Sequence, residues 1–216
     1  NGVITSSAGN HAQGVALSAL KLNCNATILM PITTPLVKVN AVRNLKAKVI
    51  LFGDNYDETH KEAIRLSEEK NLCFIHPFDD PDVIAGQGTI ALEIIEQVPE
   101  FDSVVVPIGG GGLISGISLA LKELKPSTKL IGCEPENVDD TFQMYKANKR
   151  IEMAHRMSVA DGLMAIVGQL TLPIIQENVD DIVLATEKEI IDTTRQVWER
   201  MKIVIEPSCA LALAAV

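Results

Sequence analysis

The sequence is short of positive charge, of cysteine pairs and of long apolar runs, and each shortage narrows the class of protein. Its 19 Lys and Arg residues face 28 Asp and Glu residues, for a formal charge of -9 at pH 7. A basic face that could neutralise phosphates is therefore lacking, which argues against a nucleic-acid partner. No apolar run reaches the roughly 20 residues that a membrane-spanning helix needs, so we expect no membrane partner.

The four cysteines are scattered along the chain without a CxxC pair, which disfavours both a zinc site and a disulfide framework. Cys24, Cys73 and Cys133 lie in or beside apolar, strand-like stretches, so we expect buried and reduced thiols. These features predict a soluble, cytoplasmic protein whose ligand is a small molecule.

Strand-like apolar runs alternate with segments of helical period, a pattern typical of α/β proteins with parallel sheets and crossover helices. The predicted strands are residues 3–5, 26–30, 48–52, 73–75, 103–107, 129–133 and 181–185. The predicted helices are residues 10–22, 35–45, 56–70, 84–96, 113–124 and 187–202, with a last one after Pro207. A cluster of proline and aspartate at 77–81 separates two series. We therefore predict a small α/β domain at 1–77 and part of a larger domain at 78–216.

Two helix starts carry recognisable caps. Thr34 is expected to cap a helix with Pro35 in its first turn, and Asp54 to cap the next helix. Residues 134–168 lack a clean period, so we expect them to wrap around the site or the domain edge.

Four consecutive glycines, Gly109 to Gly112, lie between a strand pattern and a helix pattern that begins at Leu113. Such a run costs about 2 to 4 kcal/mol relative to alanine unless close backbone approach or positive φ is needed. The amides and the dipole at a helix start favour an anion, so this turn predicts a phosphate site. A glycine-rich turn without a ligand is the alternative.

A second strand-to-helix turn contains Ser7, Ala8, Gly9, Asn10 and His11. Hydroxyls and amides at a helix start can hold a carboxylate or a phosphate, and the Asn10 amide can bond a ligand hydroxyl. Local capping is the alternative for Asn10 and His11. Two such turns in two α/β units predict a cofactor phosphate and a substrate carboxylate, or one ligand with two anionic ends, in a cleft between the domains.

Five motifs in order make the whole chain resemble the pyridoxal-phosphate enzymes of fold type II, in the threonine dehydratase and serine racemase family with its tryptophan synthase beta-like fold. They are SAGNHAQG at 7–14, IAGQGT at 84–89, GGGG at 109–112, ADG at 160–162 and EP at 206–207. The resemblance implies that Gly109 to Gly112 with Leu113 hold the phosphate of pyridoxal phosphate, and that Asn10 bonds its ring hydroxyl. It also implies that the Ser7 to His11 loop holds the carboxylate of an amino-acid substrate.

Within that family the chain resembles the dehydratases more than the racemases. Serine racemases carry a proton-transferring serine at the position of Ala8 and an arginine at the position of Thr59. Segments 53–55 and 78–81 are similar to threonine dehydratase. Since β-elimination does not need bases on both faces of the substrate, the resemblance implies conversion of L-threonine or L-serine to a 2-oxo acid and ammonia. A serine racemase-like enzyme is the alternative.

Glu134, Val138 and Asp140 match the positions at which racemase-like members bind a divalent cation through two carboxylates and a backbone carbonyl. Such hard oxygen ligands suit Mg or Ca. Two solvated carboxylates in an acidic protein are the alternative.

The resemblance also indicates what the chain lacks. The lysine that carries the cofactor in this family lies in a serine-x-lysine motif upstream of the Ser7 loop, and no lysine of this chain stands there. The serine that meets the pyridine nitrogen lies beyond Val216. We therefore expect a fragment, inactive by itself, of a longer protein that forms a homodimer or homotetramer.

Two other classes compete. A dinucleotide-binding oxidoreductase would use Gly110, Gly112 and the acidic Glu134, but Ser115 replaces its third glycine and the Ser7 loop stays unexplained. A regulatory module would bind a phosphorylated ligand and catalyse nothing.

Overall fold

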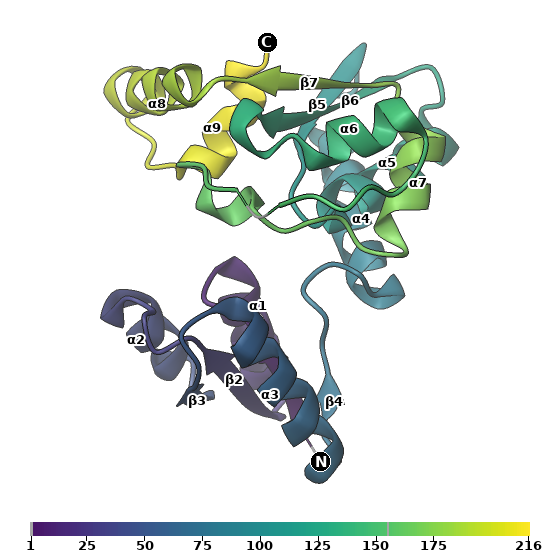
Figure 1. Cartoon of the computed structure of the whole chain (residues 1–216). Helices are drawn as coiled ribbons and strands as arrows, with labels where there is room; N and C mark the ends of the chain where they lie inside the picture. Colours follow the sequence, from purple (N-terminus) through teal and green to yellow (C-terminus); the bar gives the residue numbers. More distant parts are fainter. Residues whose placement is uncertain (1, 155) are drawn as a thin grey trace. The chain divides into compact units, whose positions relative to one another are not determined.

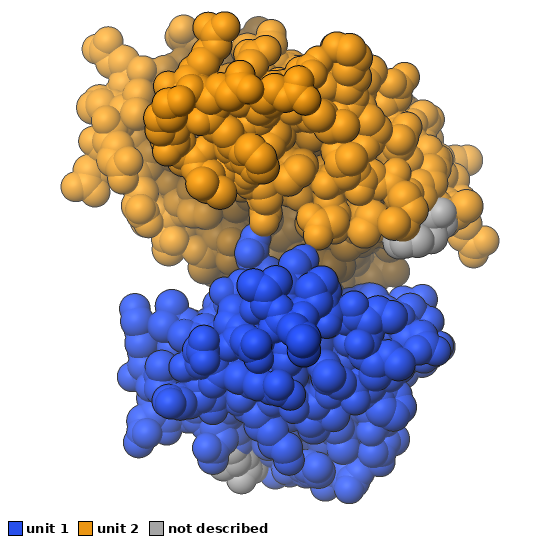
Figure 2. Space-filling view, turned by 90° about the vertical axis from the view of Figure 1, so that its left-hand side faces the viewer, with its two compact units in different colours: residues 1–77 blue, residues 78–216 orange. Residues whose placement is uncertain are grey.

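In the computed structural model, which describes residues 2–154 and 156–216, the chain divides into two compact units after Pro77 (Figures 1 and 2). Each unit is built on a parallel β-sheet with helices as crossovers. The predicted α/β class with two parallel sheets is thereby confirmed.

The first unit has a four-stranded sheet in the order β3-β2-β1-β4. Its elements are β1 (Gly2–Ser6), α1 (Asn10–Lys21), β2 (Asn25–Met30), α2 (Leu36–Asn44), β3 (Lys48–Leu51), α3 (Tyr56–Glu69) and β4 (Cys73–Phe74). Successive side chains of a strand point to opposite faces of its sheet. Ile28 accordingly packs with Val39 of α2 and with α1, whereas Leu29 packs with Ala63 of α3.

The second unit has a three-stranded sheet in the order β5-β6-β7. Its strands are β5 (Ser103–Pro107), β6 (Lys129–Pro135) and β7 (Asp181–Ala185). Its helices are α4 (Pro81–Gln97), α5 (Gly112–Leu124), α6 (Asp140–Ala147), α7 (Thr171–Asn178), α8 (Glu187–Gln196) and α9 (Pro207–Ala214), with short helical turns η1 (Glu136–Val138), η2 (Asp161–Leu163) and η3 (Val197–Met201).

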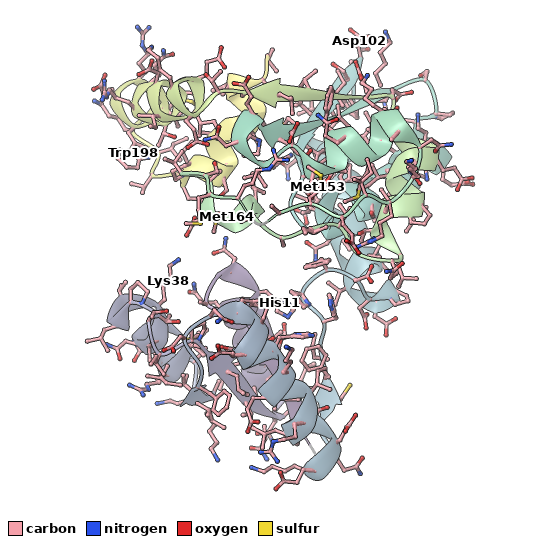
Figure 3. The ribbon with its side chains drawn as sticks, in the orientation of Figure 1. His11, Lys38, Asp102, Met153, Met164 and Trp198 are labelled. Atoms are coloured by element: carbon pink, nitrogen blue, oxygen red, sulfur yellow. The ribbon has the colours of Figure 1, made fainter. Side chains whose placement is uncertain are left out.

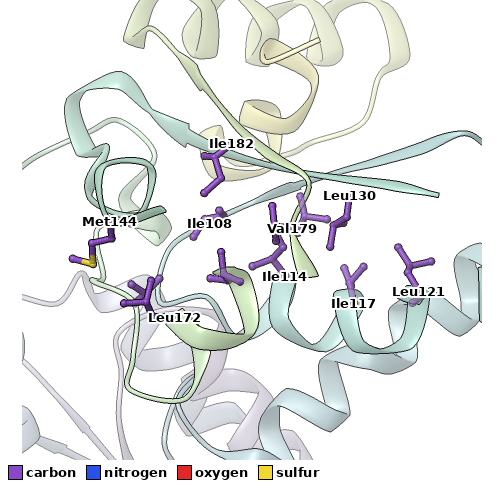
Figure 4. Close-up of a cluster of buried hydrophobic side chains, with 13 residues drawn as sticks. Ile108, Ile114, Ile117, Leu121, Leu130, Met144, Leu172, Val179 and Ile182 are labelled. Carbon is purple, nitrogen blue, oxygen red and sulfur yellow. The ribbon is translucent and has the colours of Figure 1, made fainter. Parts of the chain in front are cut away.

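The same alternation divides the core of the second unit. Leu130 and Ile182 face a large apolar cluster formed with α5 and α7 (Figure 4). Cys133 and Ala185 face the opposite cluster, to which α8 and α9 contribute. With both faces of the sheet covered, the loops at the strand ends are fixed by packing on two sides.

α4 and α5 approach closely because both carry glycine at the contact. A Cβ atom on Gly116 would overlap the carbonyl oxygen of Ile84 and lie 2.6 Å from the backbone nitrogen of Gly88. A glycine inside a helix costs about 0.5 to 1 kcal/mol relative to alanine, so close packing offsets that loss. Gly88 of the IAGQGT motif therefore has a packing role.

Several local predictions were wrong by a residue or more. Pro35 is the N-cap of α2 and does not lie in its first turn. The side chain that caps α3 belongs to Asn55, whose Oδ1 accepts the Glu58 N–H at 3.0 Å, and not to Asp54, because Asn55 is the last extended residue before the helix. Residues 134–168, predicted without regular structure, contain α6.

The burial of the cysteines was predicted correctly only in part. All four are free, and Cys133 is buried, but Cys24 is half-buried and Cys73 is exposed. Cys73 belongs to β4, a two-residue strand at the edge of its sheet, where one side lacks a neighbouring strand. Among the described residues, no helix combines the length and apolar character needed to cross a membrane.

Candidate functional site

The glycine loop, Gly109 to Gly112, joins β5 to α5. Gly111 is the N-cap of α5 and has a φ of 86°, in the left-handed region that favours glycine. The backbone N–H groups of residues 109–114 have no hydrogen-bond partner among the residues that the structure describes. Most of these residues are buried, and buried N–H groups are nearly always paired in proteins. This row of amides at a helix N-terminus therefore fits an anion with several acceptor oxygens.

The protein itself packs against the other side of this loop. A Cβ atom on Gly110 would overlap the ring of Phe78, and one on Gly112 would lie 2.9 Å from Phe78 Cβ. A Cβ atom on Gly109 would lie 3.1 Å from Leu163 Cα. The run of glycines thus has a structural cause that the sequence pattern alone did not reveal, in addition to any ligand.

Two other predicted motifs meet beside the glycine loop. The Gly162 N–H donates a hydrogen bond to Ser208 Oγ at 3.1 Å, which joins the ADG motif to the residue directly after the EP motif at 206–207. The Gly162 carbonyl oxygen lies 3.2 Å from the position of a Cβ on Gly109. Segments far apart in sequence therefore gather at one end of the β5-β6-β7 sheet.

The loop that contains Ser7 to His11 connects β1 to α1 in the first unit. The Ser7 N–H is held by the Leu29 carbonyl at 3.1 Å, and the Gly9 N–H donates to Ser7 Oγ at 3.2 Å. The Ser7 hydroxyl thus accepts one bond and keeps its proton for another partner. Within the described chain, no acceptor is bonded to the backbone N–H of Ala8, His11 or Ala12. This loop also presents donors suited to an anion.

The His11 ring, labelled in Figure 3, has its hydrogen-bond partners within the first unit. Its Nε2 lies 3.0 Å from Thr5 Oγ1 and 3.2 Å from the Ile75 carbonyl oxygen. Because that oxygen can only accept, we assign the proton to Nε2. Burial lowers the pKa of His11, which keeps the ring neutral at pH 7. The ring of His11 is therefore used inside the first unit, and Asn10 is the exposed first residue of α1.

A polar cluster that the sequence analysis missed supports this loop. Ser6 is buried and its Oγ lies 3.1 Å from His60 Nδ1. The His60 ring stacks on Tyr56, with 5.6 Å between centroids, and burial lowers the pKa of His60. Only the pairing of α3 with β1 brings these residues together, so no local motif could have indicated them.

The predicted metal-binding residues lie together where β6 leads into α6. Glu134 accepts the N–H groups of Thr141 at 3.1 Å and Phe142 at 2.7 Å, so it caps α6. Asp140 is 5% exposed, and its Oδ2 has no hydrogen-bond partner among the described residues. Burial raises the pKa of Glu134 to about 8 and that of Asp140 to about 6, because it disfavours the charged carboxylates.

The expectation of two solvated carboxylates therefore does not describe this pair. Val138, the third predicted ligand, ends η1 between them. The described residues contain no group of three or more His, Cys, Asp or Glu side chains that could hold a metal ion. A cation at this position would depend on backbone oxygen as well as on the two carboxylates. Each Glu134 oxygen accepts one N–H group of α6, which gives this residue a structural role at the start of that helix.

Comparison with known proteins identifies the family. The family described as pyridoxal-phosphate dependent enzyme matches residues 1–216. An L-threonine ammonia-lyase of Thermotoga maritima is 44% identical over 100% of this chain and 54% of its own length. A serine racemase of Oryza sativa subsp. indica is 40% identical over 99% of this chain and 63% of its own length.

A solved structure agrees with these sequence relatives. The processed form of threonine deaminase isoform 2 from Solanum lycopersicum matches with a TM-score of 0.96 at 43% identity, over 99% of this chain and 59% of that chain. The chain thus spans little more than half the length of the relatives that it matches. It belongs to the family of pyridoxal-phosphate-dependent enzymes of fold type II that includes threonine dehydratases and serine racemases.

Proposed function

We propose that the protein carrying this chain is an ammonia-lyase that converts L-threonine or L-serine to a 2-oxo acid and ammonia with pyridoxal phosphate. The observation that carries the proposal is the row of backbone N–H groups at residues 109–114 for which the described part of the chain supplies no acceptor. A phosphate group has the charge and the number of acceptor oxygens to satisfy it. The 44% identity to an L-threonine ammonia-lyase supports the choice of reaction.

In this proposal the second unit is part of the cofactor-binding domain and the first unit is the small domain that binds the substrate carboxylate. Gly109 to Gly112 with Leu113 donate backbone N–H groups to the cofactor phosphate, and the Asn10 side chain bonds the ring hydroxyl. When bound, pyridoxal phosphate withdraws electrons from the α-carbon of the amino acid and makes its proton acidic.

The substrate carboxylate is assigned to the loop of Ser7 to His11. The Ser7 hydroxyl and the backbone N–H groups of Ala8 and His11 are the donors available there. The hydrogen bonds of the neutral His11 ring and the Ser6–His60 contact anchor the loop to the first unit. These donors therefore stay fixed as charge shifts during the reaction. The lysine that carries the cofactor in the family has no counterpart among the residues of this chain, and we assign no catalytic base to any of them.

Two positions favour elimination over racemisation. Ala8 presents only a methyl group where a racemase needs a proton donor and acceptor. Thr59, at the position of the racemase arginine, is fully buried, and its Oγ1 lies 2.8 Å from the carbonyl oxygens of both Phe52 and Asn55, which share its one proton. It therefore serves the structure of α3. A serine racemase-like enzyme remains the second candidate because of the 40% identity to a serine racemase.

The test uses the whole protein loaded with pyridoxal phosphate. We expect 2-oxobutanoate from L-threonine or pyruvate from L-serine, measured by NADH oxidation with lactate dehydrogenase, and no D-serine by chiral chromatography. Substantial D-serine would favour the racemase. Cofactor binding without either product would favour a regulatory module, and absence of cofactor binding would refute the assignment.

We further propose that Glu134, Asp140 and the Val138 carbonyl oxygen bind Mg or Ca. The buried, unpartnered Oδ2 of Asp140 supports this, because it needs a proton or a cation. In calorimetric titration of chelator-treated protein with Ca²⁺, Asp140→Asn should abolish binding, whereas Asp192→Asn on the exposed face of α8 should not. Absence of binding in the unmodified protein would refute the site.

A homodimer or homotetramer is proposed from the family resemblance, and a cytoplasmic location from the unpaired cysteines and the composition. Light scattering of the purified whole protein and cell fractionation test them. A monomer, or recovery with an organelle, would contradict the respective proposal.

A further inference from the structure

One buried hydroxyl contacts the backbone of the glycine loop. Thr171, the first residue of α7, is fully buried. Its Oγ1 donates to the Gly110 carbonyl oxygen at 2.8 Å and accepts the Gly168 N–H, also at 2.8 Å. Both capacities of the hydroxyl are used, so its orientation is fixed.

The bond to Gly110 determines which way the next amide points. The described chain contains no cis peptide bond, so the Gly110 carbonyl and the Gly111 N–H point in opposite directions across one planar peptide. With the carbonyl held by Thr171, the Gly111 N–H points away from α7. That N–H belongs to the row of amides that find no acceptor in residues 2–154 and 156–216.

Glycine at both ends leaves this peptide plane little restrained by its own residues. Gly110 and Gly111 lack the side chains that restrict φ and ψ elsewhere, and Gly111 already lies in the left-handed region. Rotation of the plane would turn the Gly110 carbonyl oxygen, instead of the Gly111 N–H, toward a bound anion. An external contact is needed to hold one orientation, and the Thr171 hydroxyl provides it.

Thr171 is itself held in place from the segment that precedes α4. Asp79 accepts the N–H groups of Leu170 at 2.8 Å and Thr171 at 3.2 Å, which caps α7. Its neighbour Phe78 packs against Gly110. Two adjacent residues thus hold both the loop and the helix that orients the loop.

We infer that Thr171 is a positioning residue for the cofactor phosphate: its hydroxyl orients the Gly110–Gly111 peptide so that the Gly111 N–H serves the anion. The inference rests on the proposed function, since the anion is taken to be the phosphate of pyridoxal phosphate. Thr171 does not itself contact the phosphate. Its loss should therefore weaken binding of the phosphate and leave binding of the rest of the cofactor unchanged.

The experiment compares two probes on the whole protein after removal of the cofactor. Pyridoxal phosphate and pyridoxal, which lacks the phosphate, are each titrated by fluorescence. The variants are Thr171→Val, which keeps the shape but not the hydroxyl, and Thr171→Ser, which keeps the hydroxyl. Thr194→Val is the control, because Thr194 is a buried threonine whose hydroxyl bonds the Ile190 carbonyl in α8.

We expect Thr171→Val to weaken pyridoxal phosphate binding about tenfold or more, the effect of one hydrogen bond to a charged group. Its affinity for pyridoxal should stay within about twofold, and Thr171→Ser should restore most of the loss. Thr194→Val should change neither affinity. If Thr171→Val does not fold, Thr171→Cys takes its place, because a thiol is a weaker donor.

Each other outcome is informative. If Thr171→Val leaves the ratio of the two affinities unchanged, for example because binding of both probes weakens equally, the inference is overturned and Thr171 is a structural residue. Failure of the unmodified protein to bind pyridoxal phosphate would instead overturn the proposed function. The two failures are therefore distinguishable.

Discussion

Alanine at Gly111 and alanine at Gly86 are the same chemical change with opposite expected effects on stability. At Gly111 the φ of 86° costs a residue other than glycine about 1 to 2 kcal/mol. Its new Cβ would lie 2.9 Å from Thr171 Cβ and from Ile175 Cδ1, and such overpacking costs about 1 to 3 kcal/mol. Restriction of the unfolded chain returns up to about 1 kcal/mol. The free energy of unfolding should fall by roughly 1 to 5 kcal/mol.

Gly86 is the matched control. It lies inside α4, is exposed, and a Cβ there would meet no atom within 4 Å. Because alanine is the better helix former, Gly86→Ala should raise the free energy of unfolding by about 0.5 to 1 kcal/mol.

Urea unfolding without ligand, followed by tryptophan fluorescence, measures both changes. The only tryptophan, Trp198, lies in the second unit, where its indole N–H donates to the Ile205 carbonyl at 2.9 Å. The signal therefore reports the unit that contains both substitutions. A Gly111→Ala midpoint equal to that of the unmodified protein would refute the reasoning, as would a loss of the same size for Gly86→Ala.

Three further predictions concern the second unit. Burial raises the pKa of Cys133 to about 12, whereas Cys209 is exposed. Iodoacetamide at pH 8 should therefore label Cys209 in the native protein and Cys133 only after unfolding, as measured by mass spectrometry. Rapid labelling of Cys133 in the native protein would contradict this. The Leu130 N–H donates to Asp180 Oδ2 at 2.7 Å and holds the pKa of this carboxyl below its ordinary value. The charged carboxylate therefore stabilises the fold above about pH 4, and this stabilisation is lost as the pH falls through the lowered pKa. In Asp180→Asn the free energy of unfolding should therefore depend less on pH in the acidic range, by less than about 1 kcal/mol. Urea titrations at several pH values measure this, and an unchanged pH dependence would count against the prediction. Thr186→Ala removes the capping box of α8 and should lower the unfolding free energy by about 1 kcal/mol, whereas Thr186→Ser should retain it.

Much of the fold could be predicted because its signals are local. The period of apolar residues indicated both parallel sheets and most helices, since a strand or a helix exposes its pattern within a few consecutive residues. The exact caps were less predictable. Asp54 and Asn55 are both good capping residues, and the choice between them depended on which one keeps an extended backbone before α3.

The glycine loop shows both what the sequence by itself determined and what only the tertiary structure decided. The run from Gly109 to Gly112, placed between a strand and a helix, was sufficient to predict an anion site, because the amides at a helix start belong to consecutive residues. The contacts that shape the loop come from Phe78 and Thr171, which lie 30 or more positions away in the sequence. No local pattern indicates such contacts, because they exist only once the chain has packed. The sequence by itself thus determined where we predict an anion site, and the packing decided how the amides of that loop are held.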